Sequence, residues 1–117
     1  AGAKVNATTS SGHTPLHYAT SNNKFNFVDF LIQNGANTNA KSNSGVTPLH
    51  SASLSDDNRI IELLLNKQAQ VNALTKDGVK LFATGTPLDW AQKANKEKAI
   101  SLLRKNGAKT AKELKTK

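Results

Sequence analysis

The chain has 117 residues, of which 37% are hydrophobic and 21% are charged, so its composition suits one compact domain and not a disordered chain. It contains no cysteine, which excludes disulfides, zinc–thiolate sites and thiol nucleophiles and fits an intracellular protein. The net charge of +8 lies mostly at one end: residues 1–74 hold five basic against four acidic residues, whereas residues 75–117 hold eleven against four.

A phrase recurs along the chain at a spacing of 33 residues. SGHTPLHYA occupies positions 11–19 and SGVTPLHSA occupies positions 44–52. A third copy, DGVKLFATGTPLDWA at positions 77–91, contains six extra residues, 80–85, between Val79 and Thr86. Self-similarity at this period indicates a solenoid, in which each unit buries its apolar face only by stacking on its neighbours.

The first complete unit predicts two short helices. Thr14 is a suitable N-cap and Pro15 suits the first helical position, so a helix is expected over residues 15–21. Two asparagines then break the helix. Apolar residues at i, i+3, i+6 and i+7, starting with Phe25, predict a second helix that stops at Gly35. The polar segment after Gly35 is expected to form a loop or a hairpin.

Later units depart from the first at a few positions. Asp56 and Asp57 precede the second helix of the next unit, where an N-cap and a first turn favour acidic residues. Gln68 replaces the glycine that ends this helix, which is expected to strain the cap by about 1 kcal/mol. In the third unit Arg104 occupies an otherwise apolar position, and residues 110–117 are expected to add a short helix, so the array is expected to end in a polar face.

We divide residues 1–117 into a single domain of successive units. Residues 1–8 are interpreted as the tail of a preceding repeat, 9–41 and 42–74 as complete repeats, 75–109 as a repeat with the loop insertion at 80–85 and the character of a cap, and 110–117 as a C-terminal extension. The chain is therefore expected to come from a longer array. The first unit shows no capping adaptation, so its three phenylalanines are expected to be partly uncovered or to serve as a lid.

These features resemble the ankyrin repeat family. The resemblance rests on TPLHYA, TPLHSA and TPLDWA, on the helix ends NGAN and NGAK, and on VNA, which are in phase over nearly the whole chain. It implies an all-α fold, an ankyrin-repeat solenoid of stacked helix-turn-helix units with hairpin-like loops. Asp89, which replaces the histidine of the motif, and the insertion KLFATG depart from the family pattern.

The sequence offers little for catalysis. For His17 and His50, in the TPLH motifs, the resemblance implies structural hydrogen bonds within and between repeats. Neighbouring helices would hold them about 8–10 Å apart, too far for a shared metal. No carboxylate pair, nucleophile elbow or phosphate loop has the required spacing. We expect no enzyme activity, no cofactor and no metal site. The resemblance also implies that Asn39 and Asn72 tie loops to the backbone.

In the family, loop tips and inner helices form a concave recognition surface whose variable positions carry over onto a mostly polar set of residues here. Val46, Leu54, Leu74 and Val79 stand out in this set, because a solvated surface would favour polar side chains. The candidate partner-binding residues are Ser10, Ser11, His13, Ser21, Asn22, Lys41, Asn43, Ser44, Val46, Leu54, Ser55, Leu74, Lys76, Asp77, Val79, Leu81, Phe82 and Lys93.

The apolar pair Leu81 and Phe82 has two interpretations. The insertion that contains it falls where a loop tip meets an inner helix, and insertions in repeat arrays often lie on the binding face. In the interpretation that we favour, the pair packs over Leu74, Val79 or Trp90. In the other, the pair is an exposed anchor for a partner.

The combined prediction is a non-catalytic scaffold that binds a partner protein of unknown identity and forms the recognition part of a larger protein. We expect it to be monomeric, to span no membrane and to be cytoplasmic, in the host cytoplasm if its parent is a secreted effector. The alternative is binding of a polyanion or nucleic acid by the basic C-terminal third, for which a solvated cap is the simpler explanation. Nucleic acid is the weaker choice, because no aromatic platform alternates with the lysines.

Overall fold

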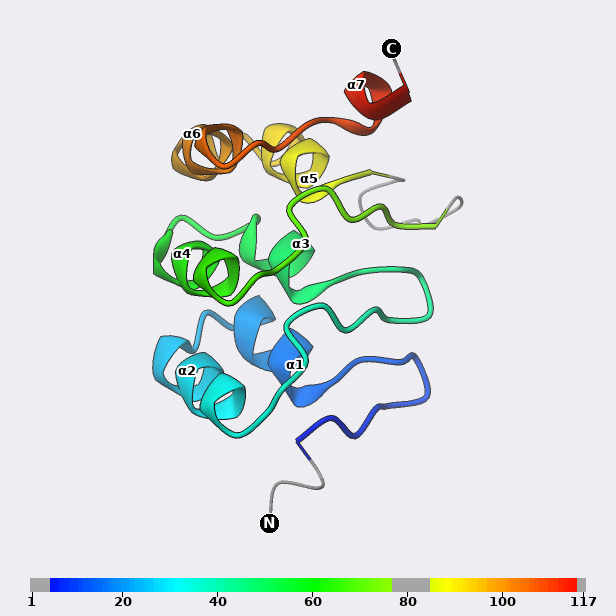
Figure 1. Ribbon diagram of the computed structural model, residues 1–117, viewed down its shortest axis with the longest axis vertical. Coiled ribbons are helices and arrows are strands. Elements are labelled where there is room, and N and C mark those ends of the chain that lie inside the picture. Colours follow the sequence, from blue (N-terminus) through cyan, green and yellow to red (C-terminus); the bar gives the residue numbers. More distant parts are fainter. Residues whose placement is uncertain (1–4, 77–84, 116–117) are drawn as a thin grey trace.

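The computed structural model describes residues 5–76 and 85–115. Over these residues the secondary structure consists of seven helices and no strands: α1 (Pro15–Ser21), α2 (Phe25–Gln33), α3 (Pro48–Ala52), α4 (Arg59–Asn66), α5 (Pro87–Lys93), α6 (Glu97–Lys105) and α7 (Ala111–Lys115). Three helix pairs stack along the long axis of the molecule, and α7 lies at the C-terminal end (Figure 1). The predicted all-α solenoid of helix-turn-helix units is confirmed.

Each inner helix, α1, α3 and α5, begins with the same arrangement. Thr14, Thr47 and Thr86 are N-cap residues with extended backbone, and each threonine hydroxyl accepts a hydrogen bond from the amide of the third helical residue. The side chain of that third residue accepts from the threonine amide, which closes a capping box, and a proline occupies the first helical turn. The helix starts predicted from TPLH and TPLD are therefore confirmed.

The outer helices, α2, α4 and α6, end in a left-handed residue. Gly35 and Gly107 have φ values of +95° and +89°, which glycine adopts at little cost. Gln68 holds the equivalent place after α4 with φ +69°, a conformation that is unfavourable for a residue with a Cβ atom. The positive φ of Gln68 is therefore the structural basis of the strained cap predicted there.

The start of α4 differs from the prediction. The N-cap residue is Asn58, and its side chain does not cap the helix. Asp57 instead accepts a hydrogen bond from the Arg59 amide at 3.0 Å and pairs with its guanidinium at 2.9 Å, while Asp56 pairs with Lys96 at 3.0 Å. The two carboxylates therefore secure the turn between α3 and α4 and link it to the next helix pair.

The core forms where equivalent residues of successive helix pairs stack. Helix α1 packs on α3, α3 packs on α5, and α2 packs on α4. Two rows of leucines are buried along the stack: Leu16, Leu49 and Leu88 from the inner helices, and Leu31, Leu64 and Leu103 from the outer helices. Because each row runs across all three pairs, the units shelter one another's apolar side chains, as the 33-residue period predicted.

The loops between helix pairs fold back on themselves and lie side by side (Figure 1). The Thr9 amide donates to the His13 carbonyl, and the Ser42 amide donates to the Val46 carbonyl, each at 2.9 Å. In the third loop the Thr75 amide donates to the Gly85 carbonyl at 3.0 Å, so the same closing bond forms although six more residues lie between them.

The two ends of the stack differ. On the first pair, Phe27 and Phe30 are 41% and 58% exposed, as expected for an end without a polar face, whereas Phe25 is partly buried against the core. Tyr18 is also exposed, at 63%. At the other end, Arg104 pairs with Glu113 of α7 at 2.7 Å, which ties the short helix to the third pair. The short helix expected over residues 110–117 is present as α7, whereas the division into repeats and a C-terminal cap stays a prediction.

Candidate functional site

The two TPLH histidines join successive units. Each Nδ1 accepts from the N-cap amide of its own helix, so the proton lies on Nε2. The Nε2 of His17 donates to the Val46 carbonyl at 2.7 Å, and that of His50 donates to the Gly85 carbonyl at 3.0 Å. Burial lowers the pKa of His17 and lowers that of His50 to about 4. With both nitrogens of each ring engaged, the geometry supports a structural role.

In the third unit, Asp89 occupies the place of the histidine and joins its own N-cap residue to the next element. Its carboxylate accepts from the Thr86 amide at 2.9 Å and from the Ala111 amide, the first of α7, at 2.8 Å. A histidine in this place would offer a donor to the next unit, whereas α7 presents an N–H that needs an acceptor. The change from histidine to aspartate therefore matches the presence of α7 where a further loop would otherwise stack.

Asparagines also recur every 33 residues, in the segment that leads into each loop. Asn39 donates from Nδ2 to the Gln68 carbonyl at 3.2 Å and accepts at Oδ1 from the Gln70 amide at 2.7 Å. Asn6 and Asn72 make the equivalent pair of bonds to their neighbouring units. The tie between loop and backbone that the resemblance implied for Asn39 and Asn72 is present, and it reaches from one unit to the next.

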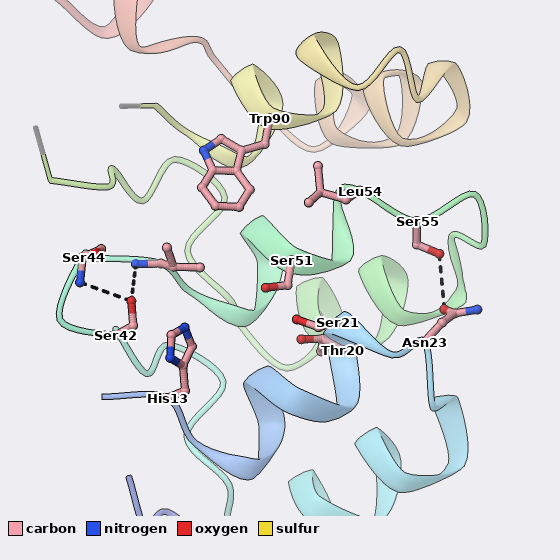
Figure 2. A pocket seen from close by; sticks show the side chains of 11 residues that line it. His13, Thr20, Ser21, Asn23, Ser42, Ser44, Ser51, Leu54, Ser55 and Trp90 are labelled. Carbon is pink, nitrogen blue, oxygen red and sulfur yellow. Dashed lines mark hydrogen bonds between the residues drawn. The ribbon is translucent and has the colours of Figure 1, made fainter. Parts of the chain in front are cut away.

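A groove of about 480 Å³ lies between the hairpin-like loops and the inner helices (Figure 2). In Figure 2, Ser42 and Ser44 face it from a loop, Thr20 and Ser21 from the end of α1, Ser51 from α3, and Trp90 from α5. Among the described residues, its lining contains no carboxylate and no lysine or arginine: His13, Thr20, Ser21, Asn23, Ser42, Ser44, Val46, Ser51, Leu54, Ser55 and Trp90.

The groove combines hydroxyl groups with one apolar region. Thr20, Ser42 and Ser55 bond to neighbouring protein groups, which fixes their orientation. Over the part of the chain that the structure describes, the hydroxyls of Ser21 and Ser44 make no hydrogen bond and are available to a ligand.

Leu54, which is half-buried, and the edge of Trp90 supply the apolar side of the groove (Figure 2). The ring of Trp90 lies against His50, with ring centroids 5.0 Å apart, and only 2% of the residue is exposed. The indole is thus a fixed wall and not a face on which a ligand ring can stack.

Six of the predicted partner-binding residues line this groove: His13, Ser21, Ser44, Val46, Leu54 and Ser55. Others serve the loops, since the Asn43 amide and side chain donate to the Ser11 and Ser10 carbonyls, each at 2.9 Å. Asn22, Lys41, Leu74, Lys76 and Lys93 are exposed but outside the lining. Asp77, Val79, Leu81 and Phe82 lie outside the described residues, so both interpretations of the apolar pair stay predictions.

Sequence reasoning missed Thr20, Asn23, Ser42, Ser51 and Trp90, which also line the groove. Helical periodicity could have indicated two of these residues, Ser51 and Trp90. Residues three apart on a helix share a face, and Ser51 precedes Leu54 by three positions just as Trp90 precedes Lys93.

Other classes of site find little support over residues 5–76 and 85–115. This part of the chain has no group of three or more histidines and carboxylates arranged to hold a metal ion. No helix in it is both long and apolar enough to cross a bilayer. Among the basic residues of the C-terminal third, Arg104 and Lys96 are paired with carboxylates.

Comparison with known proteins places the fold in a family. A search of curated proteins gives no match to this chain. A family model described as ankyrin repeats, in three copies, matches residues 1–75, which is more than half of the sequence. The third helix pair lies beyond that match, yet it begins with the same threonine capping box as the first two. The chain therefore belongs to the ankyrin repeat family.

Proposed function

We propose that this domain is a non-catalytic scaffold that binds a partner protein through its loop tips and inner helices, as the recognition part of a larger protein. Ankyrin repeats are generally protein-interaction modules. The observation that carries the proposal is the groove of about 480 Å³, which takes its lining from all three helix pairs. A single unit contributes too few side chains to form it, so the binding surface depends on the stack.

The scaffold should present this surface with little rearrangement. The capping boxes, the histidine bonds and the asparagine ties fix each loop against its helices before a partner arrives. A surface held in this way loses little conformational entropy on binding. We expect a monomer that docks its partner as a rigid body.

A charge placed at Leu54 tests the proposal. The wild-type chain, Leu54→Asp and the control Phe30→Asp, whose phenylalanine is 58% exposed and outside the groove lining, are immobilised and exposed to a cell extract. At least one captured protein should be lost on Leu54→Asp and kept on Phe30→Asp. If circular dichroism shows both variants folded and every captured protein stays on Leu54→Asp, the groove is not the binding surface.

The alternative function, polyanion binding by the basic C-terminal third, has less support. Helix α6 and its flanks carry several exposed lysines, but Arg104 and Lys96 are engaged in ion pairs with Glu113 and Asp56. A steep loss of binding to heparin or to DNA with added salt would favour this alternative. Weak binding that is the same for all polyanions would favour a solvated cap.

A further inference from the structure

The groove changes character along the stack, and the change follows the repeat register. Ser21, Leu54 and Lys93 are equivalent residues near the ends of the three inner helices, 33 and then 39 positions apart. Because α1 packs on α3 and α3 on α5, these residues form a row along the stack, in which Ser21 and Leu54 line the groove and Lys93 lies outside its lining. The row runs from a hydroxyl to an aliphatic group to a cation.

The loop wall shows a similar change. Ser10, Asn43 and Lys76 are equivalent residues of the three loops, and all are exposed. The Asn43 side chain bonds to the Ser10 carbonyl, and the Lys76 amide donates to the Ser44 carbonyl at 2.8 Å, so the three loops lie in sequence. Both rows therefore have a lysine at the third unit, outside the groove lining.

Two carboxylates near this end are bonded to other groups. Asp89 accepts from the Thr86 and Ala111 amides, and Asp56 pairs with Lys96. Lys93 is exposed one helical turn from Trp90, on the same face of α5. The third unit thus offers positive charge beside the apolar region formed by Leu54 and the edge of Trp90.

From this arrangement we infer the chemistry of the partner segment: an extended peptide with an apolar side chain at Leu54 and an acidic side chain about three residues away, at Lys93. The inference rests on the proposed function. Packed helices of neighbouring units lie about 8–10 Å apart, and an extended chain advances about 3.3 Å per residue, so one unit corresponds to about three residues of the partner. The available hydroxyls of Ser21 and Ser44 can hydrogen-bond to the backbone of the uncharged part of this peptide.

A random 12-residue peptide library displayed on phage tests the inference. The library is selected on the wild-type chain and depleted on Leu54→Asp, which removes peptides that bind elsewhere. The enriched sequences should share an aliphatic or aromatic residue with Asp or Glu two to four positions away. An enriched peptide is then titrated by fluorescence polarisation against Lys93→Glu and against Lys98→Glu, a matched control on α6 outside the groove.

Each outcome separates the two proposals. Lys93→Glu should weaken binding about three- to tenfold, Lys98→Glu should leave it within about twofold, and a peptide with lysine for its acidic residue should prefer Lys93→Glu. Peptides that depend on Leu54 but lack an acidic residue would overturn the inferred chemistry and leave the scaffold function standing. Equal losses in both lysine variants would also overturn it, because the attraction would be unspecific. Failure to enrich any peptide that depends on Leu54 would count against both proposals.

Discussion

Acid should weaken the fold through His50. The imidazole is fully buried, and burial lowers its pKa from 6.5 to about 4. In the unfolded chain the same group titrates near 6.5, so between pH 6.5 and about 4 the unfolded state binds a proton that the folded state does not. The free energy of unfolding therefore keeps its full value above pH 6.5 and falls as the pH drops below it.

The size of this loss follows from the difference between the two pKa values, about 2.5 units. At about 1.4 kcal/mol per unit, complete protonation costs about 3.4 kcal/mol, and at about pH 5 the loss is about 2 kcal/mol. Small domains are stable by about 5–15 kcal/mol, so this is a substantial fraction. With a urea dependence of about 1–3 kcal/mol per molar, the unfolding midpoint should fall by roughly 1 M.

Urea unfolding at about pH 7.5 and about pH 5, followed by the fluorescence of Trp90, measures the loss. The matched variant is His50→Gln, whose amide stays neutral. Its loss between the two pH values should be smaller by about 2 kcal/mol, and the remaining loss includes the contribution of His17, whose pKa is also lowered by burial. An NMR titration that gives His50 a pKa above about 6, or the same pH dependence in both proteins, would refute the reasoning.

Three further changes test the fold. Gln68→Gly should raise the free energy of unfolding by about 0.5–1 kcal/mol, since glycine tolerates φ +69°; no gain in the urea midpoint would contradict a strained cap. Leu64→Ala, at a fully buried position, should lower it by about 2–5 kcal/mol, and the exposed control Leu74→Ala by less than about 0.5 kcal/mol; similar losses would contradict the packing. Asp89→Ala should cost about 1–3 kcal/mol and speed hydrogen exchange of the Ala111 amide, and unchanged protection there would show that the carboxylate does not anchor α7.

The sequence predicts the fold well wherever local chemistry repeats. Thr14 and Pro15 set the start of α1, and the same pair of residue types sets α3 and α5, so one capping argument locates three helices. The turn before α4 is harder, because Asp56, Asp57 and Asn58 are all good capping residues. Asp57 pairs locally with Arg59, two residues away, whereas Asp56 pairs with Lys96, which lies in another unit and outside any local pattern.

The sequence predicts the candidate site less completely than the fold, because residue type alone does not show which side chains face the groove. Positions such as Leu54 and Val46 stand out because an apolar residue occupies a place expected to be solvated. Ser51 and Ser42 carry no such signal, since a serine is ordinary on any surface. For Trp90 the sequence predicts only that it belongs to a helix, and its part in the groove depends on the orientation of α5 against α3.

The third unit keeps the register of the first two units but differs from them in surface chemistry. Its capping box, its closing bond from Thr75 to Gly85 and its bond from His50 follow the register of the first two units despite the insertion. Among the equivalent positions whose chemistry changes, a histidine becomes Asp89, a leucine becomes Lys93, and an aliphatic residue becomes Arg104. Asp89 and Arg104 both bond to α7, whereas Lys93 is the changed position that we infer to contact the partner segment. The inferred contact at Lys93 would let such a scaffold alter its ligand by substitution at one register position, while the bonds that hold its units together stay the same.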